Sequence, residues 1–423
     1  MKKLKTIFSP RNLAVWLLII VLIVAVPDLD EPAMSKTEAI VTTLCVDKVE
    51  DKIQIATTVL APAEDKKVNL QVYSGEGATL GEAMGNVSLL IGKEMGFAQT
   101  QILALGTNLC KDSIMPTLDY MTRTKKVGRN TVLINFEGDI KDFTNAVSNL
   151  NVEKSLRLEE IINFDQRYVL TKDSNVESFY KGYFSNITLG IMPQIKLTNE
   201  ENPTSIEIEM KSGGTSSGSS SGSSSASSGG SSGASSSGES SKKYLVNDGT
   251  TCVFKDGKLN SVVSAENMRR VNIFLNDAQK GEIKVENVSD DLYNDATVVC
   301  SLRNKDISLK PSFKNGKPTY KADLELVIVV EEVDEKLPSD KFLQRNKDFV
   351  TPTLIEKLKE TVSNEMEQII DYCKTNKIDL IGVYRNFYHR QYKDFMNYID
   401  KVGTDNYLDG IDYQIEISVT TEY

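Results

Sequence analysis

The sequence has very little histidine, and this scarcity removes most of the familiar catalytic centres. Its 423 residues include one histidine, His389, so any Ser-His-Asp or Cys-His arrangement would have to be built around that ring. No HExxH, GxGxxG or GxxxxGK[ST] motif is present. The GxSxG matches, such as 218–222, fall in a tract whose composition alone produces them. We therefore expect no catalytic residue and no cofactor, and we interpret His389 as a partly exposed residue at the end of a helix.

Cysteine is also sparse, and its spacing does not suit a metal. The five cysteines are far apart, with no CxxC or Cys/His pairing, and the DxDxDG calcium loop is missing. An odd number cannot form a complete disulfide framework. The pattern predicts buried apolar thiols and no metal site, although one disulfide, for example between Cys252 and Cys300, stays open. The five are Cys45, Cys110, Cys252, Cys300 and Cys373.

Positive charge is in deficit. The chain has 49 Lys and Arg against 59 Asp and Glu, a net charge of -10. Nucleic-acid binding needs concentrated positive charge to release counterions from phosphate, so we exclude nucleic acid as the main partner. With 40% hydrophobic residues, a chain of this length suits two or three domains, each able to bury a core.

One apolar run stands out, at residues 13–26, where no charged or polar side chain occurs. Basic residues precede it and acidic residues follow it, so the positive-inside rule predicts a cytoplasmic tail and export of everything after Pro27. The run is shorter than a typical span of about 20 residues, as in a cleaved signal peptide. However, residues 24–28 make a poor cleavage site, and no cysteine follows closely that could be lipidated. We expect an uncleaved anchor within residues 1–35.

A second biased segment, residues 212–241, contains 18 serines and 8 glycines in 30 positions. Without large apolar side chains it cannot offset the entropy of ordering, so it is predicted to be a flexible coil. Strand-like segments at 205–210 and 243–246 flank it. It is therefore either a loop inserted in one sheet or a linker between domains, and its reach of roughly 30 Å suits both. We divide the chain into 1–35, 36–205, 206–243 and 244–423, with the third part as the linker or insertion.

The region before this tract is predicted to be mixed α/β. Strands are expected at 38–46, 53–60, 68–73, 102–105 and 131–136. Helices are expected at 80–91 with Thr79 as N-cap, and at 113–122, 140–150, 152–162 and 175–184.

The region after the tract is predicted to be rich in strands, with one long helix. A hairpin turn is expected at 254–259, a helix at 264–276 capped by Ser264, and strands at 251–255, 296–302, 307–313, 320–333 and 411–419. The long amphipathic helix spans 352–375 and follows the start signal Thr351-Pro352. The predicted fold class is α+β: an N-terminal membrane anchor, then a multi-domain mixed ectodomain with antiparallel sheets and packed helices, ending in a C-terminal sheet with one long helix.

The segment 377–394 is locally basic and aromatic. It interleaves tyrosines and a phenylalanine with cations, a composition that suits a partner-docking surface or contact with anionic lipid headgroups. The alternative is an ordinary amphipathic helix that buries its aromatic rings and solvates its cations. The candidate contact residues are Arg385, Phe387, Tyr388, Arg390 and Tyr392.

Short motifs occur along the chain in a characteristic order. KIDLIG at 377–382 followed by YRNFY at 384–388 matches "K-x-D-x-x-G-x-g-r-x-f-y", TCVFKDGKL at 251–259 matches "G-x-A-V-F-K-x-D-K-L", and GEI at 281–283 matches "G-x-I". In the front half LCVDK at 44–48, GATLGEA at 77–83 and PTLDYMTR at 116–123 match "a-L-G-I-D-K", "G-k-T-i-x-E-A" and "p-x-L-D-f-l-x-R". From about residue 36 to its end, the chain thereby resembles the GerAC-like C subunits of spore germinant receptors, the Ger(x)C family.

The departures from the family pattern bear on the anchor. Family members are typically lipoproteins whose mature chain begins with a cysteine, commonly in "C-W-D", whereas this chain has PDLD at 27–30. Lipidation is therefore not expected here. The family's basic and aromatic stretch after the first helix is replaced by KEMGFAQ at 93–99, so contacts made there would differ.

The resemblance implies a non-enzymatic receptor component at the outer face of the spore inner membrane. It would assemble with two integral membrane partners, an A-type and a B-type subunit, and promote germination. It transfers no catalytic or nutrient-binding residue. The alternative is an exported cell-envelope protein that binds a ligand or partner with the same fold but has no germination role.

Overall fold

The computed structural model describes residues 38–62, 68–150, 153–154, 158, 174–185, 189–201, 205–209, 242–275, 281–334 and 350–421. The anchor predicted within 1–35, most of the helix predicted at 152–162 and the tract at 212–241 lie outside these residues. Across the ranges just given, no helix is both long and apolar enough to cross a membrane.

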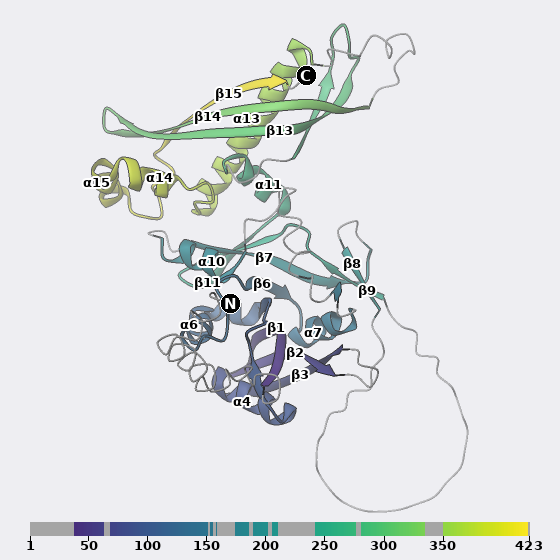
Figure 1. Cartoon of the computed structure of the whole chain (residues 1–423). Helices are drawn as coiled ribbons and strands as arrows, with labels where there is room; N and C mark the ends of the chain where they lie inside the picture. Colours follow the sequence, from purple (N-terminus) through teal and green to yellow (C-terminus); the bar gives the residue numbers. More distant parts are fainter. Residues whose placement is uncertain are drawn as a thin grey trace, which may run out of the picture.

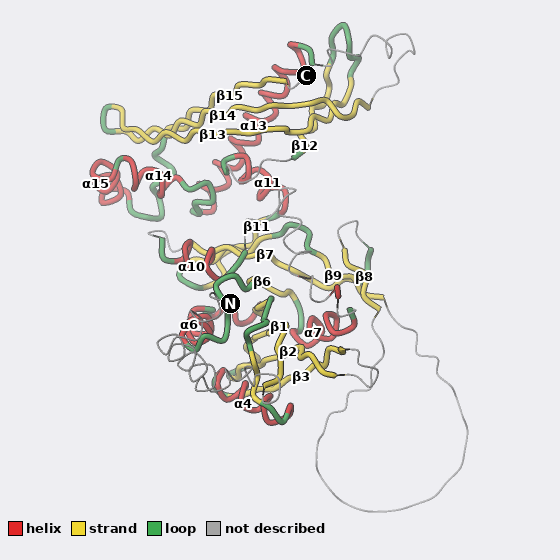
Figure 2. The backbone as a smooth tube through the Cα atoms, in the orientation of Figure 1, coloured by secondary structure: helices red, strands yellow, loops and turns green. Residues whose placement is uncertain are grey.

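The described strands form an eleven-stranded and a four-stranded sheet (Figures 1 and 2). The larger sheet runs β11-β10-β7-β6-β5-β1-β2-β3, with β4 on β1, and β9 joining β7 to β8. Its strands are β1 (Glu38–Val49), β2 (Lys52–Pro62), β3 (Val68–Gly77), β4 (Glu94–Gly96), β5 (Ile102–Gly106), β6 (Val132–Glu137), β7 (Leu189–Thr198), β8 (Ser205–Glu209), β9 (Lys242–Val246), β10 (Thr251–Lys255) and β11 (Lys258–Val263).

Helices cover both faces of this larger sheet, which makes it a three-layer unit. Residues of α4 (Leu80–Ile91), α5 (Thr107–Asp112), α6 (Met115–Arg123) and α10 (Val176–Tyr183) join one apolar core. Residues of α7 (Ile140–Asn149) pack in another core. The predicted cap of α4 is confirmed, since the Thr79 side chain accepts a hydrogen bond from the Glu82 N–H at 3.2 Å.

The prediction of antiparallel sheets is wrong for the centre of this unit. β1, β5, β6 and β7 run parallel to one another. Parallel neighbours need a crossover connection, and here α5 and α6 lie between β5 and β6 along the chain. The coarser expectation of a mixed α/β region holds.

The strands on either side of the Ser/Gly tract pair with each other. β8 and β9 are antiparallel, from Ser205 opposite Val246 to Glu209 opposite Lys242. The segment between them is therefore an insertion between two neighbouring strands. Moreover, β9, β10 and β11 all belong to the larger sheet, so that sheet continues on both sides of residues 206–243. The division of the chain into domains at these residues stays a prediction.

One strand serves two cores. In β10 the side chains of Cys252 and Phe254 point into the core beneath α4 and α6. The intervening Val253 belongs to the core of the smaller sheet, together with Val263 of β11. Because successive strand residues face opposite sides, β10 forms part of the wall of both units.

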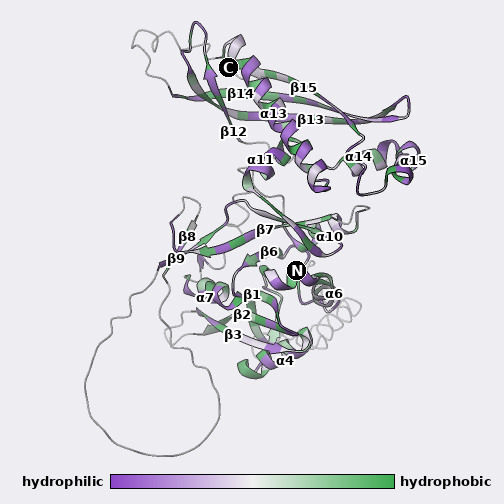
Figure 3. Cartoon of the chain, turned by 180° about the vertical axis from the view of Figure 1, so that it is seen from behind, coloured by the Kyte–Doolittle hydropathy of each residue, from purple (hydrophilic) through white to green (hydrophobic). Residues whose placement is uncertain are grey.

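The smaller unit consists of β12 (Glu282–Val288), β13 (Ala296–Lys314), β14 (Lys317–Asp334) and β15 (Asp412–Thr421), with α11 (Ala265–Ile273) and α13 (Pro352–Asn376). The predicted strands at 296–302 and 307–313 are one long strand, and hydrophobic and hydrophilic residues alternate along β13 and β14 (Figure 3). The antiparallel prediction fails again at β15, which runs parallel to β14; the chain returns to β14 through α13 and the helices after it.

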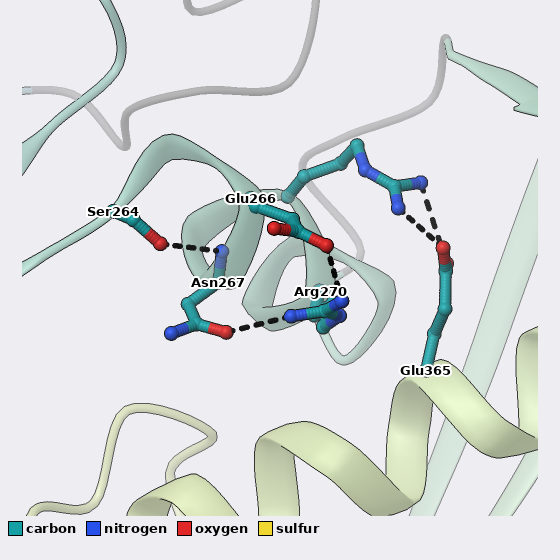
Figure 4. Close-up of polar contacts among 6 residues, drawn as sticks. Ser264, Glu266, Asn267, Arg270 and Glu365 are labelled. Carbon is teal, nitrogen blue, oxygen red and sulfur yellow. Dashed lines mark hydrogen bonds and ion pairs between the residues drawn. The ribbon is translucent and has the colours of Figure 1, made fainter.

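Polar contacts fix the two helices beside this sheet. The predicted cap Ser264 accepts a hydrogen bond from the Asn267 N–H, and Arg270 contacts Glu266 and Asn267 within α11 (Figure 4). Arg269 forms a bidentate ion pair with Glu365 of α13. The long helix begins as predicted, with the Thr351 hydroxyl accepting from the Leu354 N–H at 3.1 Å.

Candidate partner-docking site

The predicted contact segment folds as a loop and two short helices after α13. The long helix ends where Lys377 adopts a left-handed conformation, with φ of 55°. A loop leads to Gly382, whose φ of 73° favours glycine, and α14 (Val383–Arg390) starts there. After a break at Gln391, α15 (Tyr392–Val402) follows.

A buried carboxylate organises this loop. Asp379 accepts hydrogen bonds from the N–H groups of Val383 at 2.9 Å and Tyr384 at 2.7 Å. The Tyr407 hydroxyl donates a third, at 2.8 Å. These amides are among the first of α14, which have no partner within the helix, so Asp379 both caps the helix and ties it to the loop that follows α15.

Burial controls the protonation of this cluster. Removal from water raises the pKa of Asp379 above its usual range, although the amides of Tyr384 and Val383 and the Tyr407 hydroxyl lower it. Burial also raises the pKa of Tyr407 well above its usual value, and the nearby Asp379 charge raises it further. The tyrosine therefore stays a hydrogen-bond donor at neutral pH.

Aromatic rings from α14, α15 and the loop after α15 pack against one another beside this loop. Tyr384 meets the edges of Phe395 and Tyr407, with ring centroids 5.0 and 5.6 Å apart. Phe387 stacks on Phe395 at 5.0 Å and on Tyr320 of β14 at 5.9 Å. Aromatic pairs at these separations add to the stability gained from burial alone, so α14 and α15 are held firmly against the sheet.

The five predicted contact residues separate into two groups. Phe387 is fully buried in the core, which agrees with the alternative of an amphipathic helix for this side chain. Arg385 and Arg390 are exposed, Tyr388 is half-buried, and Tyr392 is 53% exposed. Tyr388 and Tyr392 lie together, with ring centroids 5.0 Å apart, while Arg390 donates to the Leu309 carbonyl of β13 at 2.5 Å. The structure thus places four of the five at the surface around one helix break.

A second buried carboxylate has the same role in the larger unit. Asp47 of β1 accepts a hydrogen bond from the Leu109 N–H at 2.9 Å, near the start of α5, and one from the Asn108 amide at 3.4 Å. Burial raises its pKa. Gly106 lies so close that a Cβ there would be 2.1 Å from the Asp47 Cγ, so this position requires glycine.

Both aspartates lie within the motifs described above, Asp47 in LCVDK and Asp379 in KIDLIG, but the sequence pattern predicts no role for either. A carboxylate that caps a helix several residues or a whole strand away has no local signature. The available signal was a short apolar loop with an acidic residue before a glycine, at Asp379, and an acidic residue in a hydrophobic strand, at Asp47.

The remaining reactive side chains behave as expected from their types. All five cysteines are free and buried, so the open alternative of a Cys252–Cys300 disulfide is not realised. Burial raises the pKa of Cys252, Cys300 and Cys373 to about 12, which keeps them as thiols. His389 is exposed in the last turn of α14, as predicted. Within the described ranges, no cluster of three His, Cys, Asp or Glu could hold a metal ion.

The smaller unit also contains a cavity of about 710 Å³ between α11, α13 and the sheet. Aliphatic residues such as Ile273, Leu324 and Val362 line it. Its charged residues balance, with Arg269, Arg303 and Lys305 opposite Glu282, Glu331 and Glu365. The Lys305 ammonium donates to the carbonyls of Asn272 and Leu275 at 2.5 Å each, at the end of α11, where a cation stabilises the helix.

Comparisons with known proteins cover both units. The family model "Spore germination protein N-terminal domain" matches residues 36–197, and "Spore germination B3/ GerAC like, C-terminal" matches residues 249–422. Among solved structures the chain is similar to "Crystal Structure of the GerBC protein", with 13% identity and a TM-score of 0.47 over 90% of this chain and 97% of that chain. No curated protein matches the chain.

Proposed function

Because the chain belongs to the GerAC-like family of spore germination proteins, we propose that it is a non-enzymatic, membrane-anchored subunit of a spore germinant receptor. It assembles with A-type and B-type integral membrane subunits and promotes germination. Its ectodomain lies at the outer face of the spore inner membrane, tethered by the apolar segment 13–26. The observation that carries this proposal is the match of two family models, in order, to both folded units.

The chemistry of the site supports assembly in place of catalysis. The buried groups of the aromatic cluster are bound to one another: Asp379 accepts from three donors, and Asn386 donates to the Tyr320 hydroxyl at 2.8 Å. Burial keeps the thiols protonated. The polar network therefore serves to hold α14 in place.

We propose that the exposed side chains around the α14–α15 break form the surface that contacts a receptor subunit. Arg385, Tyr388, Arg390 and Tyr392 combine cations with accessible rings, the residue types enriched where proteins bind one another. The buried Phe387 supports this surface from below. The Asp379 cap fixes its orientation.

Co-purification from detergent-extracted spore membranes tests the proposal. We expect the full chain to bring down the A-type and B-type subunits, and the double variant Arg385→Glu with Tyr392→Ala to lose them while keeping its thermal stability. Lys141→Glu, an exposed residue on α7 of the other unit, makes a matched charge change and should bind normally.

Two results would count against this function. Recovery without either receptor subunit, together with normal germination of spores lacking the chain, would favour the exported envelope protein with no germination role. That alternative has one observation in its favour, the PDLD sequence at 27–30 in place of the family's cysteine and tryptophan.

A further inference from the structure

The parallel strands of the larger unit begin at one common edge, and the chain enters the fold there. Glu38, the first described residue, pairs with Glu94 of β4. Beside it the Gln101 N–H donates to the Thr42 carbonyl at 3.0 Å, and the Val132 N–H donates to the Gln101 carbonyl at 2.8 Å. We call this the strand-start edge, defined by the first residues of β1, β5 and β6.

The sequence limits how far this edge can lie from the proposed tether. The apolar segment ends at residue 26, and residues 27–37 lead from it to Glu38. A fully extended chain of that length spans at most about 40 Å. If the segment crosses the membrane, the strand-start edge must lie within this reach of the bilayer surface.

Exposed apolar side chains lie near this edge. α4 leads directly into β4, and in its last turn Leu89 is 81% and Leu90 is 65% exposed. Phe184, just after α10, is 73% exposed and stacks on Tyr180. These three are the most exposed large hydrophobic side chains of the described residues, and such groups commonly mark a membrane or protein contact.

A basic and aromatic cavity of about 1130 Å³ opens at the same edge. Gln101 and Thr131, which directly precede β5 and β6, line it, together with Phe97 and Phe184. Its charged lining residues are three cations, Lys125, Arg129 and Lys181, and one acid, Glu177, which pairs with Lys181 at 2.8 Å.

Further charged residues lie along the strand-start edge. Lys126 lies 4.8 Å from the centre of the Phe97 ring, and Lys93 is exposed between α4 and β4. Two acids, Glu38 and Glu94, lie at the β1–β4 end of the edge. The excess positive charge is therefore concentrated around the cavity.

We infer that the strand-start edge is a lipid-facing surface that binds an anionic bilayer. Leu89, Leu90 and Phe184 enter the interfacial region, and Lys125, Arg129 and Lys126 contact headgroup phosphates, the pairing of apolar and basic groups that holds proteins at such surfaces. The inference rests on the proposed tether. The proposed lipid contact and the proposed receptor contact are then on different parts of the molecule, since the surface around Tyr392 lies on the smaller unit, away from α4 (Figures 1 and 3).

Depth measurements on the full chain in vesicles test this surface. A fluorophore is placed at Leu89→Cys or Phe184→Cys, with Lys401→Cys on α15 as the matched exposed control; the native thiols are buried and will not compete. In vesicles containing phosphatidylglycerol we expect spin-labelled lipid to quench positions 89 and 184 but not 401. Raising the salt from about 0.1 to 1 M shortens the Debye length from about 10 to 3 Å and should weaken that quenching.

Charge reversal provides a second arm. Lys125→Glu with Arg129→Glu should reduce the quenching at position 89, and Lys401→Glu should leave it unchanged. One result would overturn the lipid-facing surface but leave the tether standing. In that result the chain stays with the vesicles after a carbonate wash, yet a water-soluble quencher reaches positions 89, 184 and 401 equally. Release of the chain by the wash would instead contradict the proposed tether, and with it the inference that depends on the tether.

Discussion

Each of the two units places a buried aspartate at the start of a short helix, and the two sites differ in what surrounds the carboxylate. Asp379 accepts hydrogen bonds from two main-chain amides and from the Tyr407 hydroxyl, and the Tyr407 ring packs against that of Tyr384. Asp47 receives one well-formed amide bond from Leu109 and lies against Gly106. The neighbouring Lys48 forms a surface ion pair with Asp112, the last residue of α5.

The difference shows how one device serves two purposes. In the larger unit the carboxylate locks a helix against the end of two parallel strands, where close backbone approach matters most. In the smaller unit it positions two helices that carry an exposed surface. We therefore expect the Asp379 site to depend on its hydrogen bonds, and the Asp47 site on its tight packing.

The largest expected contrast comes from removing each carboxylate. Asp379→Ala leaves three buried donors without an acceptor, each costing about 1–3 kcal/mol, so we expect the free energy of unfolding to fall by about 3 kcal/mol or more. Asp47→Ala leaves mainly the buried Leu109 amide without an acceptor, and we expect the free energy of unfolding to fall by about 1–3 kcal/mol. Urea unfolding followed by circular dichroism measures both; equal losses would show that the two sites are equivalent.

Replacement of the glycine at each site should have the opposite ranking, with the larger loss of stability at the Asp47 site. Gly106→Ala places a Cβ 2.1 Å from the Asp47 Cγ, and such overpacking typically costs about 1–3 kcal/mol. In Gly382→Ala the new Cβ would lie in open space, with no neighbouring atom closer than 3.9 Å. The only cost is the left-handed backbone conformation, about 1–2 kcal/mol. If thermal unfolding shows the second variant to be the less stable, packing is not what distinguishes the Asp47 site.

Removing single side-chain donors probes the hydrogen bonds alone. Tyr407→Phe deletes one buried bond to Asp379 without changing shape and should cost about 1–2 kcal/mol. Asn108→Ala removes a long, part-buried contact of 3.4 Å from an exposed side chain and should change stability by less than about 0.5 kcal/mol. Similar effects in chemical unfolding would argue against the hydrogen-bonded character of the Asp379 site.

The smallest expected effect is the dependence on pH. Burial raises both aspartate pKa values in the folded state, so between the unfolded value and the folded one the native chain binds more protons. Each aspartate therefore contributes its full stabilisation at pH values below its pKa in the unfolded chain. This contribution is lost as the pH rises through its pKa in the folded chain. Asp379→Asn and Asp47→Asn should each remove part of this decline. Comparison of each variant with the parent chain from pH 4 to 8 checks the sign, and a steeper decline in a variant would contradict it.

Local signals in the sequence predicted the elements well. Thr79, Ser264 and Thr351 cap the helices expected of them, because a hydroxyl before an apolar periodic run satisfies the first free amides. The apolar stripe of α13, from Leu354 to Cys373, is buried as its spacing of three and four residues predicts.

Pairing between distant segments could not be predicted in the same way. The parallel direction of β5 and β6 depends on how α5 and α6 pack, and α5 has only six residues, too few to show a periodic pattern. Likewise, Phe387 alternates with cations in sequence, yet its ring is buried, because the partner that covers it, Tyr320, is 67 positions earlier. The exposure of single residues in an amphipathic segment is set by such distant contacts.

The shared strand β10 has a mechanical consequence. Separate domains usually rotate about a flexible linker unless a large apolar interface joins them. Here Val253 and Val263 lie in the core of the smaller unit, while Cys252 and Phe254 lie in that of the larger one. Rotation of one unit against the other would have to pull apolar side chains into water or break the β7–β10 pairing. We therefore expect the surface around Tyr392 and the strand-start edge to keep a fixed position relative to each other.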